Sequence, residues 1–284
     1  MPDHIDEFES MFRKAERERF TYADIPLNNV TIITDGSQEE AEQTKSGLIS
    51  FCPRLESVTD WRMITGDQYS NVVELLRLLN EVQTDLIVTW RHLQEEALIP
   101  QHSLGVYLDV LTQTTSIPVL VLPGTATLPM PLAEKDCDKV MVVADHISGD
   151  NRLINYAARM CRNGGQVWLC HVEDNRAFQH YMDAISRIPE IDTSEAATLL
   201  DQQLLKTAGD FIENCIKVLN REGPNVSYES IVRRGHFLRD YRELIDEQQV
   251  DLLVANTKDD DQLAMHGVAY SLSVEMTDVA MLLL

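Results

Sequence analysis

Apolar runs of strand length alternate with amphipathic stretches along the second half of the chain. Between these runs, apolar residues recur at three- and four-residue spacing, which is typical of a helix with one face on a core. Strands that are apolar on both sides pack between two layers of helices, so this half predicts a mainly parallel five-stranded sheet flanked by helices. The predicted strands are 139–144, 167–172, 226–232, 251–255 and 279–284.

Capping and breaking residues mark the predicted helix boundaries in this half. Ser148 is placed to cap the first helix, and Ser194 to open a longer one that Pro224 stops. The stretch 173–193 shows no regular spacing, so we expect it to be irregular.

The first half repeats this plan in a shortened form. Its predicted strands are 30–34, 58–64, 85–89 and 116–122, and Ser37 with Glu40 forms a capping box for its first helix. Asp35 and Asp85, which end and begin strands, are 50 positions apart, whereas the matching Asp145 and Asp251 are 106 apart. The first copy has therefore lost roughly one strand and one helix.

Two segments interrupt this repeat. Residues 123–137 hold three prolines among small and acidic residues, as an interdomain linker would. Residues 1–26 contain an amphipathic helix whose apolar face must dock on its own chain, a second copy or a partner. We therefore expect domains at 27–122 and 138–284.

The order of these motifs resembles that of two universal stress protein domains in tandem. The motifs that carry the resemblance are Asp35-Gly-Ser37, Asp145-His-Ile-Ser148, Asn155-Tyr-Ala-Ala-Arg-Met160, Cys170-His-Val-Glu173 and Ile117-Pro-Val-Leu-Val. The resemblance implies an α/β fold of two Rossmann-like (adenine nucleotide alpha hydrolase-like) domains, each with a mainly parallel five-stranded sheet of order 3-2-1-4-5, the first one shortened. It also implies a nucleotide crevice beside strands one and four, where the switch-point rule for open α/β sheets independently places a ligand.

Both copies depart from the Gly-x2-Gly-x9-Gly-(Ser/Thr) pattern that holds nucleotide phosphates in this family. In the second half, Asn256 and Asp259 replace the first two glycines, and 259–261 is a run of three aspartates. In the first half, Trp90 and Leu93 replace the early glycines and are expected to fill the pocket. Like charges about 4 Å apart repel by around 4 kcal/mol at an effective dielectric constant of 20, so we do not expect ATP binding of the family kind.

A different ligand remains an option for the second domain. A binding module would use six side chains at the crevice, which are Asp145, His146, Asn256, Thr257, Lys258 and His266. The degenerate first-half site comprises Asp35, which is expected to cap the next helix turn, together with Trp90 and Gly105. For Asp145, ligand binding and helix capping are equally supported. Arg233 and Arg234 either hold an anion at the next helix N-terminus or face water.

No catalytic set and no cofactor are predicted. The histidines His146, His171, His236 and His266 follow strand ends and could converge on a divalent metal. Because histidines at such positions are commonly satisfied polar caps, we predict no metal site. The five cysteines never form Cys-x-x-Cys, so they suggest neither a disulfide framework nor a zinc site, and most are expected to be core residues.

Charge and hydropathy restrict the partners. The 284 residues include 46 Asp and Glu against 24 Lys and Arg, a formal charge of −22, which disfavours nucleic acid and anionic membrane surfaces. No apolar run reaches the length of a membrane span, and the N-terminus has no secretory signal, so we expect a cytoplasmic location without direct membrane insertion.

These features favour a non-enzymatic, universal stress protein-like regulatory or ligand-sensing protein. One alternative is the cytoplasmic regulatory domain of a cation-chloride cotransporter or amino-acid permease-like transporter, which the run from Asp85 to Gly124 resembles more loosely. A second is an ATP- or AMP-binding universal stress protein. We expect a homodimer or an intramolecular domain pair, with a protein partner or parent transporter as an option. A last strand at a sheet edge would also invite pairing with another copy.

Overall fold

One sheet organises the computed structural model, which describes residues 20–95, 103–125, 128–132, 136–144, 147, 150–257 and 267–284. In these residues nine strands lie in the order β2-β1-β3-β4-β9-β8-β5-β6-β7. Neighbouring strands are parallel except for β4 and β9, which are antiparallel. The strands are β1 (Asn29–Ile33), β2 (Asp60–Ile64), β3 (Leu86–Arg91), β4 (Val119–Thr125), β5 (Lys139–Ala144), β6 (Gln166–Asp174), β7 (Ser227–Gly235), β8 (Leu252–Ala255) and β9 (Ala280–Leu283).

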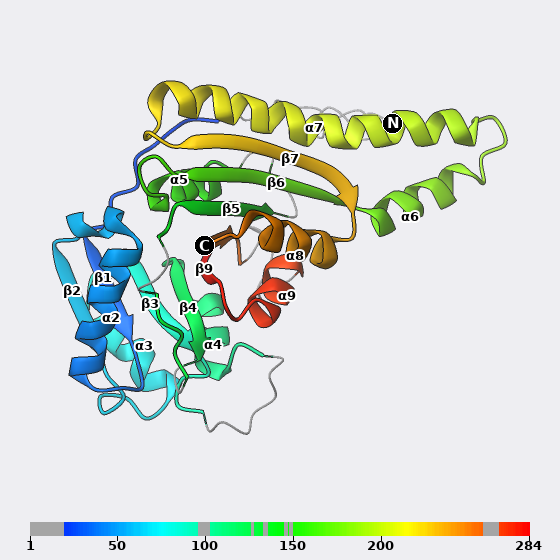
Figure 1. Ribbon diagram of the computed structural model, residues 1–284. Helices are drawn as coiled ribbons and strands as arrows, with labels where there is room; N and C mark the ends of the chain where they lie inside the picture. The colour runs from blue at the N-terminus through cyan, green and yellow to red at the C-terminus, as the bar shows by residue number, and fades with distance from the viewer. Residues whose placement is uncertain are drawn as a thin grey trace, which may run out of the picture.

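Helices cover both faces of this sheet (Figure 1). One face carries α2 (Gln38–Phe51), the 3₁₀ helix η1 (Pro53–Ser57), α5 (Asn151–Met160) and α7 (Thr193–Glu222). The other carries α3 (Val72–Asn80), α4 (Val106–Thr114), α8 (Phe237–Gln248) and α9 (Gly267–Glu275). The predicted α/β fold with helices on both faces is therefore confirmed. The physical reason is that strands that are apolar on both sides can be buried only between two helical layers.

The strand order separates into a short and a long series. Among the described residues the first half contributes β2-β1-β3-β4, and the second contributes β7-β6-β5-β8-β9. The second series has the 3-2-1-4-5 order that the resemblance implied, and the first lacks one edge strand. The shortening of the first half is therefore seen directly in the sheet.

The last strand does not lie at an edge, and the expectation that it does was wrong. β9 pairs with β8 on one side and with β4 on the other, with Val119 opposite Leu283 and Val121 opposite Met281. All four residues of β9 are buried. Its backbone hydrogen bonds are thus satisfied inside the chain, and both apolar clusters contain residues of both halves.

Two helix starts differ from the prediction. Asp150 caps α5, and the predicted cap Ser148 lies outside the described residues. Asp192, two residues before Ser194, caps α7. In each case the predicted and the observed capping residue are two positions apart, and only the backbone conformation decides which side chain accepts from the first free N–H groups of the helix.

The stretch 173–193 is not irregular, because it contains α6 (Asn175–Ile185). Phe178 and Met182, one helical turn apart, are buried on its inner face. These two buried residues are too few to give a periodic pattern in the sequence. The helix is stabilised mainly by its packing against α7 and β6. In Figure 1, α6 and the start of α7 extend beyond the end of the sheet.

The segments outside the two predicted domains are described in part. The amphipathic pattern within 1–26 falls mostly on residues 1–19, which lie outside the described residues, while Phe20 is buried in the core. β4 continues to Thr125, inside the segment 123–137, and Leu132 and Cys137 of that segment are buried. The domain limits stay a prediction.

Arg91 is a fully buried charge between the two halves. From β3 its guanidinium donates to the carbonyls of Ser273 (2.8 Å), Met276 (3.0 Å) and Leu122 (3.3 Å). Burial lowers the pKa of Arg91 to about 10, so it keeps its charge at neutral pH. It therefore ties β3 and β4 to the end of α9.

Candidate functional site

The strand order contains two switch points, one in each half. The chain leaves β1 toward β2 on one side and returns to β3 on the other, and it does the same between β5, β6 and β8. Ligands of open α/β sheets bind at the carboxyl ends of such strand pairs. We call the space at the ends of β1 and β3 the first crevice, and that at the ends of β5 and β8 the second crevice.

Asp35 closes the first crevice from the β1 side. Its Oδ2 accepts from the backbone N–H of Gln94 at 2.8 Å, and its Oδ1 accepts from the hydroxyl of Tyr69 at 3.1 Å. The expectation that Asp35 caps the next helix was wrong, because Ser37 caps α2 and forms the predicted capping box with Glu40. Asp35 instead connects β1 with the loop after β3.

Burial shifts the titration of both partners in this contact. It raises the pKa of Asp35 above 3.8, and the hydrogen bonds from Gln94 and Tyr69 oppose that rise. Burial, with the neighbouring Asp35 carboxylate, also raises the pKa of Tyr69. Tyr69 therefore stays a neutral donor, and Asp35 is a carboxylate held in a poorly solvated position.

A carboxylate already occupies the N-terminus of α4. Glu95 Oε1 accepts from the backbone N–H of Val106 at 2.7 Å, and its Oε2 lies 2.8 Å from Nδ1 of His92. Gly105 precedes the helix with φ +87°, and a Cβ there would lie 2.8 Å from the Cα of His92. The helix N-terminus, a favourable place for a phosphate, is thus filled by the chain's own anion.

The loop that carries Glu95 has unusual backbone geometry. His92 and Gln94 both have positive φ, 58° and 56°, a left-handed conformation that residues other than glycine seldom adopt. Their conformation turns the loop back onto the first crevice, where Gln94 donates to Asp35 and to the carbonyl of Gly66. The loop is therefore held across the crevice at a local conformational cost.

The two residues expected to fill the first crevice belong to different layers. Trp90 is buried in the cluster under α2, α5 and α7, whereas Leu93 is buried in the cluster under α3 and α4. Trp90 lies within β3, where neighbouring positions face opposite sides of the sheet, and Leu93 lies in the loop after the strand, so the sequence did not reveal the side of either residue. The residues that occupy the crevice, Tyr69, Gln94 and Glu95, were not predicted. The sequence signal for them was limited to Glu95, an acidic residue in the stretch that leads to Gly105 and the start of α4.

In the second crevice, Asn256 and Thr257 make contacts within the chain. The Asn256 side-chain amide donates to the carboxylate of Asp150, which also caps α5. The Thr257 hydroxyl donates to the main-chain oxygen of Leu284 at 2.7 Å, and its N–H donates to the same atom at 2.9 Å. Asn256 therefore lies at the switch point, and Thr257 holds the end of β9.

The remaining predicted residues of this site are Asp145, His146, Lys258 and His266, which lie outside the described residues. The structure brings Asn256 together with Asp150, a residue that sequence reasoning did not include. Its identity as a capping residue, two positions after Ser148, was the available signal.

Of the four histidines, the structure describes two. His171 is buried, with Nε2 3.2 Å from a Glu173 carboxylate oxygen, and His236 precedes α8 as its N-cap residue. Among the described residues no group of three or more His, Cys, Asp or Glu side chains is placed to hold a metal ion.

The two arginines at the end of β7 are paired with carboxylates. Arg233 lies 3.0 Å from Asp240, whose other oxygen accepts from the backbone N–H of His236 at 2.8 Å. Arg234 lies 2.8 Å from Asp201 of α7. At α8, as at α4, an internal carboxylate thus occupies the position that an external anion would take.

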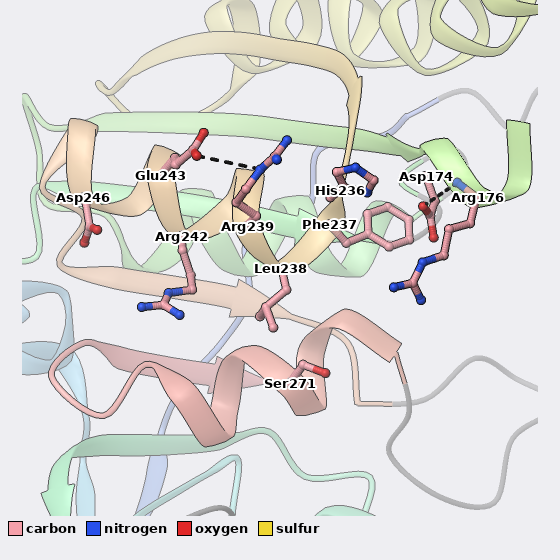
Figure 2. Close-up of a pocket in the computed structure, with 10 residues that line it drawn as sticks. All are labelled: Asp174, Arg176, His236, Phe237, Leu238, Arg239, Arg242, Glu243, Asp246 and Ser271. Atoms are coloured by element: carbon pink, nitrogen blue, oxygen red, sulfur yellow. Dashed lines mark hydrogen bonds and ion pairs between the residues drawn. The ribbon is translucent and has the colours of Figure 1, made fainter. Parts of the chain in front are cut away.

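A surface groove of about 770 Å³ lies along α8 and α9 (Figure 2). Its lining carries three arginines and three carboxylates, and Arg242 is 2.7 Å from Glu275 while Arg239 is 3.8 Å from Glu243. With balanced and partly paired charges, the groove favours no ligand class. The lining residues are Asp174, Arg176, His236, Phe237, Leu238, Arg239, Arg242, Glu243, Asp246 and Ser271.

Within the part of the chain that the structure describes, none of the helices combines the length and apolar character needed to cross a membrane. The 30-residue α7 has its charged residues spread along its whole length.

The chain is similar in fold to solved universal stress proteins, although no family model and no curated protein matches it. A universal stress protein from Archaeoglobus fulgidus DSM 4304 shares 11% identity at a TM-score of 0.48, covering 92% of this chain and 97% of that one. A functionally unknown protein from Pseudomonas aeruginosa PAO1 shares 13% identity at a TM-score of 0.47, covering 91% and 92%. These values describe a likeness of fold.

Proposed function

We propose that this chain is a non-enzymatic, universal stress protein-like regulatory or ligand-sensing protein that does not bind ATP in the usual way of that family. The observation that carries the proposal is the contact between the Glu95 carboxylate and the Val106 N–H at 2.7 Å. A triphosphate in the first crevice would need that N–H and would meet two carboxylates, those of Glu95 and Asp35.

The cost of this encounter is large compared with ordinary nucleotide affinity. A phosphate oxygen about 4 Å from one carboxylate is opposed by around 4 kcal/mol at an effective dielectric constant of 20. A micromolar dissociation constant corresponds to about −8 kcal/mol, so two such contacts remove most of it. The second half supports the same conclusion, because its sequence places three aspartates, 259–261, shortly after β8.

The internal antiparallel pair of β4 and β9 supports an intramolecular domain pair as the functional unit. In this arrangement the shortened first half completes the sheet of the second half and covers one side of β9. We propose that ligand sensing, if retained, belongs to the second half, around Asn256 and Asp150.

Thermal unfolding of the full chain with and without Mg-ATP tests the proposal. A ligand present at 100 times its dissociation constant stabilises a protein by about 2.7 kcal/mol, which is readily measured. We expect no ATP-dependent shift for the wild-type chain up to about 1 mM nucleotide. Native mass spectrometry of the same sample should show a bare monomer mass.

A pair of variants tests the role of Glu95. Glu95→Ala frees the N–H groups of α4, so we expect this variant to gain stabilisation by inorganic phosphate. Glu81→Ala, which removes an exposed carboxylate at the end of α3, is the matched control and should not respond. ATP-dependent stabilisation of the wild-type chain, or nucleotide retained in its native mass, would overturn the proposal.

A further inference from the structure

Two fully buried cysteines meet where the first half joins the second. Cys52 ends α2, and Cys137 lies immediately before the entry to β5. Both side chains are completely inaccessible to solvent and both thiols are free. In sequence they are far apart, so their proximity is a product of the fold.

The main chains of the two cysteines run side by side. The backbone N–H of Cys137 donates to the carbonyl of Phe51, the residue before Cys52, at 2.8 Å. The side chains of Cys52 and Cys137 interact in the same apolar cluster, and the Cys52 thiol donates to the carbonyl of Met160 at 3.2 Å. A disulfide needs Cα atoms within about 7 Å, and the 2.8 Å hydrogen bond from Cys137 to the residue before Cys52 holds the two main chains within that range.

The surroundings make the two thiols unequal. The hydrogen bond from Cys137 lowers the pKa of Cys52, and nearby Arg54 and Arg159 act in the same direction. The same contact and burial raise the pKa of Cys137. By contrast, burial raises the pKa of Cys215, on α7, to about 12. Because the thiolate is the reactive form, Cys52 is the better nucleophile of the pair.

We propose that Cys52 and Cys137 form a reversible intramolecular disulfide when the protein meets hydrogen peroxide. The Cys52 thiolate attacks one peroxide oxygen, the O–O bond breaks, and Cys52 sulfenic acid and water form. The Cys137 thiolate then attacks the Cys52 sulfur, forming the S–S bond and releasing a second water. In total, two thiols and one hydrogen peroxide give one disulfide and two waters, and a dithiol reverses the reaction.

The bond would fasten the first half to the entrance of the second. It would close a loop from 52 to 137 that contains β2, α3, β3, α4 and β4. Cross-linking a long loop restricts the unfolded chain, so the oxidised protein is expected to unfold at higher denaturant concentration. Since both thiols are buried, peroxide reaches them only through local opening near η1, and the reaction should be slow.

The test is peroxide treatment of the reduced full chain, followed by unfolding in denaturant with N-ethylmaleimide and intact mass measurement. The five cysteines of the untreated chain take five adducts. After oxidation we expect three adducts, a peptide cross-link between Cys52 and Cys137, and a higher urea midpoint that a dithiol restores to the starting value.

Three variants distinguish this pair from general oxidation. Cys52→Ala should keep all four remaining adducts, whereas Cys137→Ala should stop at a sulfenic acid on Cys52 without a cross-link. Neither variant should show the midpoint shift, and Cys215→Ala, the matched buried control, should still form the cross-link. If the alanine variants do not fold, peptide mapping of the oxidised wild-type chain decides alone. Sulfinic acid at Cys52 without a cross-link, a bond to a different cysteine, a disulfide between chains, or no reaction of the native protein would each overturn the proposal.

Discussion

The position of Asp35 in the first crevice makes the stability of the folded chain depend on pH. It lies half-buried between the Gln94 N–H and the Tyr69 hydroxyl, and burial raises its pKa above 3.8. A carboxyl whose folded pKa is raised binds more protons in the folded state than in the unfolded state just above pH 3.8. Its contribution to folding stability therefore falls as the pH rises through that window, and is least favourable at neutral pH.

The Asp35→Asn variant tests this sign. The amide can still accept from the Gln94 N–H, and its NH₂ group can donate to Tyr69, whose hydroxyl already contacts the carbonyl of Thr34. We expect the stability of the variant relative to wild type to be more favourable at pH 7 than near pH 3.5, measured by urea unfolding. Asp183→Asn, at an exposed position of α6, is the control. A difference independent of pH would contradict the raised pKa.

At the scale of elements, internal carboxylates at helix N-termini recur at the carboxyl edge of the sheet. Glu95 serves α4, Asp150 caps α5, and Asp240 serves α8. Each satisfies backbone N–H groups that have no partner within the helix. In a chain with a formal charge of −22, these contacts use acidic residues to stabilise the helix starts that would otherwise favour bound anions.

The Asp240→Ala variant measures how much such a contact contributes to the free energy of unfolding. It removes the acceptor for the His236 N–H and leaves Arg233 without its closest carboxylate. We expect the free energy of unfolding to fall by about 2 kcal/mol, since hydrogen bonds to charged groups contribute about 1.5–3 kcal/mol. Asp246→Ala, at the exposed far end of α8, should be neutral or slightly stabilising. Equal losses in the two variants would show that the N-terminal position has no special role.

At the scale of the whole molecule, the two halves form one structure through β4, β9 and Arg91. The antiparallel pair joins the two parallel series, and both apolar clusters cross that junction. From the first half, Arg91 adds three hydrogen bonds to carbonyls, two of which lie in or just after α9. Because the Arg91 guanidinium is buried, the hydrogen bonds to these carbonyls replace the hydrogen bonds that it would make to water.

Arg91→Ala is therefore expected to weaken both halves together. It leaves buried carbonyls without donors and opens a cavity, so we expect a loss of about 3 kcal/mol or more. Of the three tryptophans, Trp61 and Trp90 report on the first half and Trp168 on the second. In variants that keep the tryptophans of one half only, the fluorescence transitions in urea should shift by the same amount. Arg77→Ala, which breaks an exposed ion pair with Glu81, should cost at most about 0.5 kcal/mol. Separate transitions of the tryptophans of the two halves would mean that the halves unfold independently.

The sequence predicted much of the fold because the information is local. Alternation of strands and helices, the Ser37–Glu40 capping box and the shortened first half all follow from spacing over a few residues or from the repeat itself. It failed at α6, where two apolar anchors give no period, and at Asp150 and Asp192, where neighbouring residues compete to cap the same helix.

The candidate site was predicted less well, for a different reason. Sequence position placed Asp35, Gly105 and Asn256 near the ends of the correct strands, since the carboxyl ends of parallel strands share one edge. It did not show that Trp90 belongs to the opposite face, nor that Glu95 reaches back to α4. Those outcomes depend on which way a side chain points, within strand β3 for Trp90 and in the loop after it for Glu95.

The sequence by itself thus determined the types and order of most of the elements and the reduced size of the first half. The tertiary structure alone decided that β9 pairs with β4, that Arg91 joins β3 to α9, and that Cys137 lies beside Cys52. Periodicity records that a surface is apolar but not which element covers it. That choice is made by contacts between residues distant along the chain, which form only when the whole sheet is assembled.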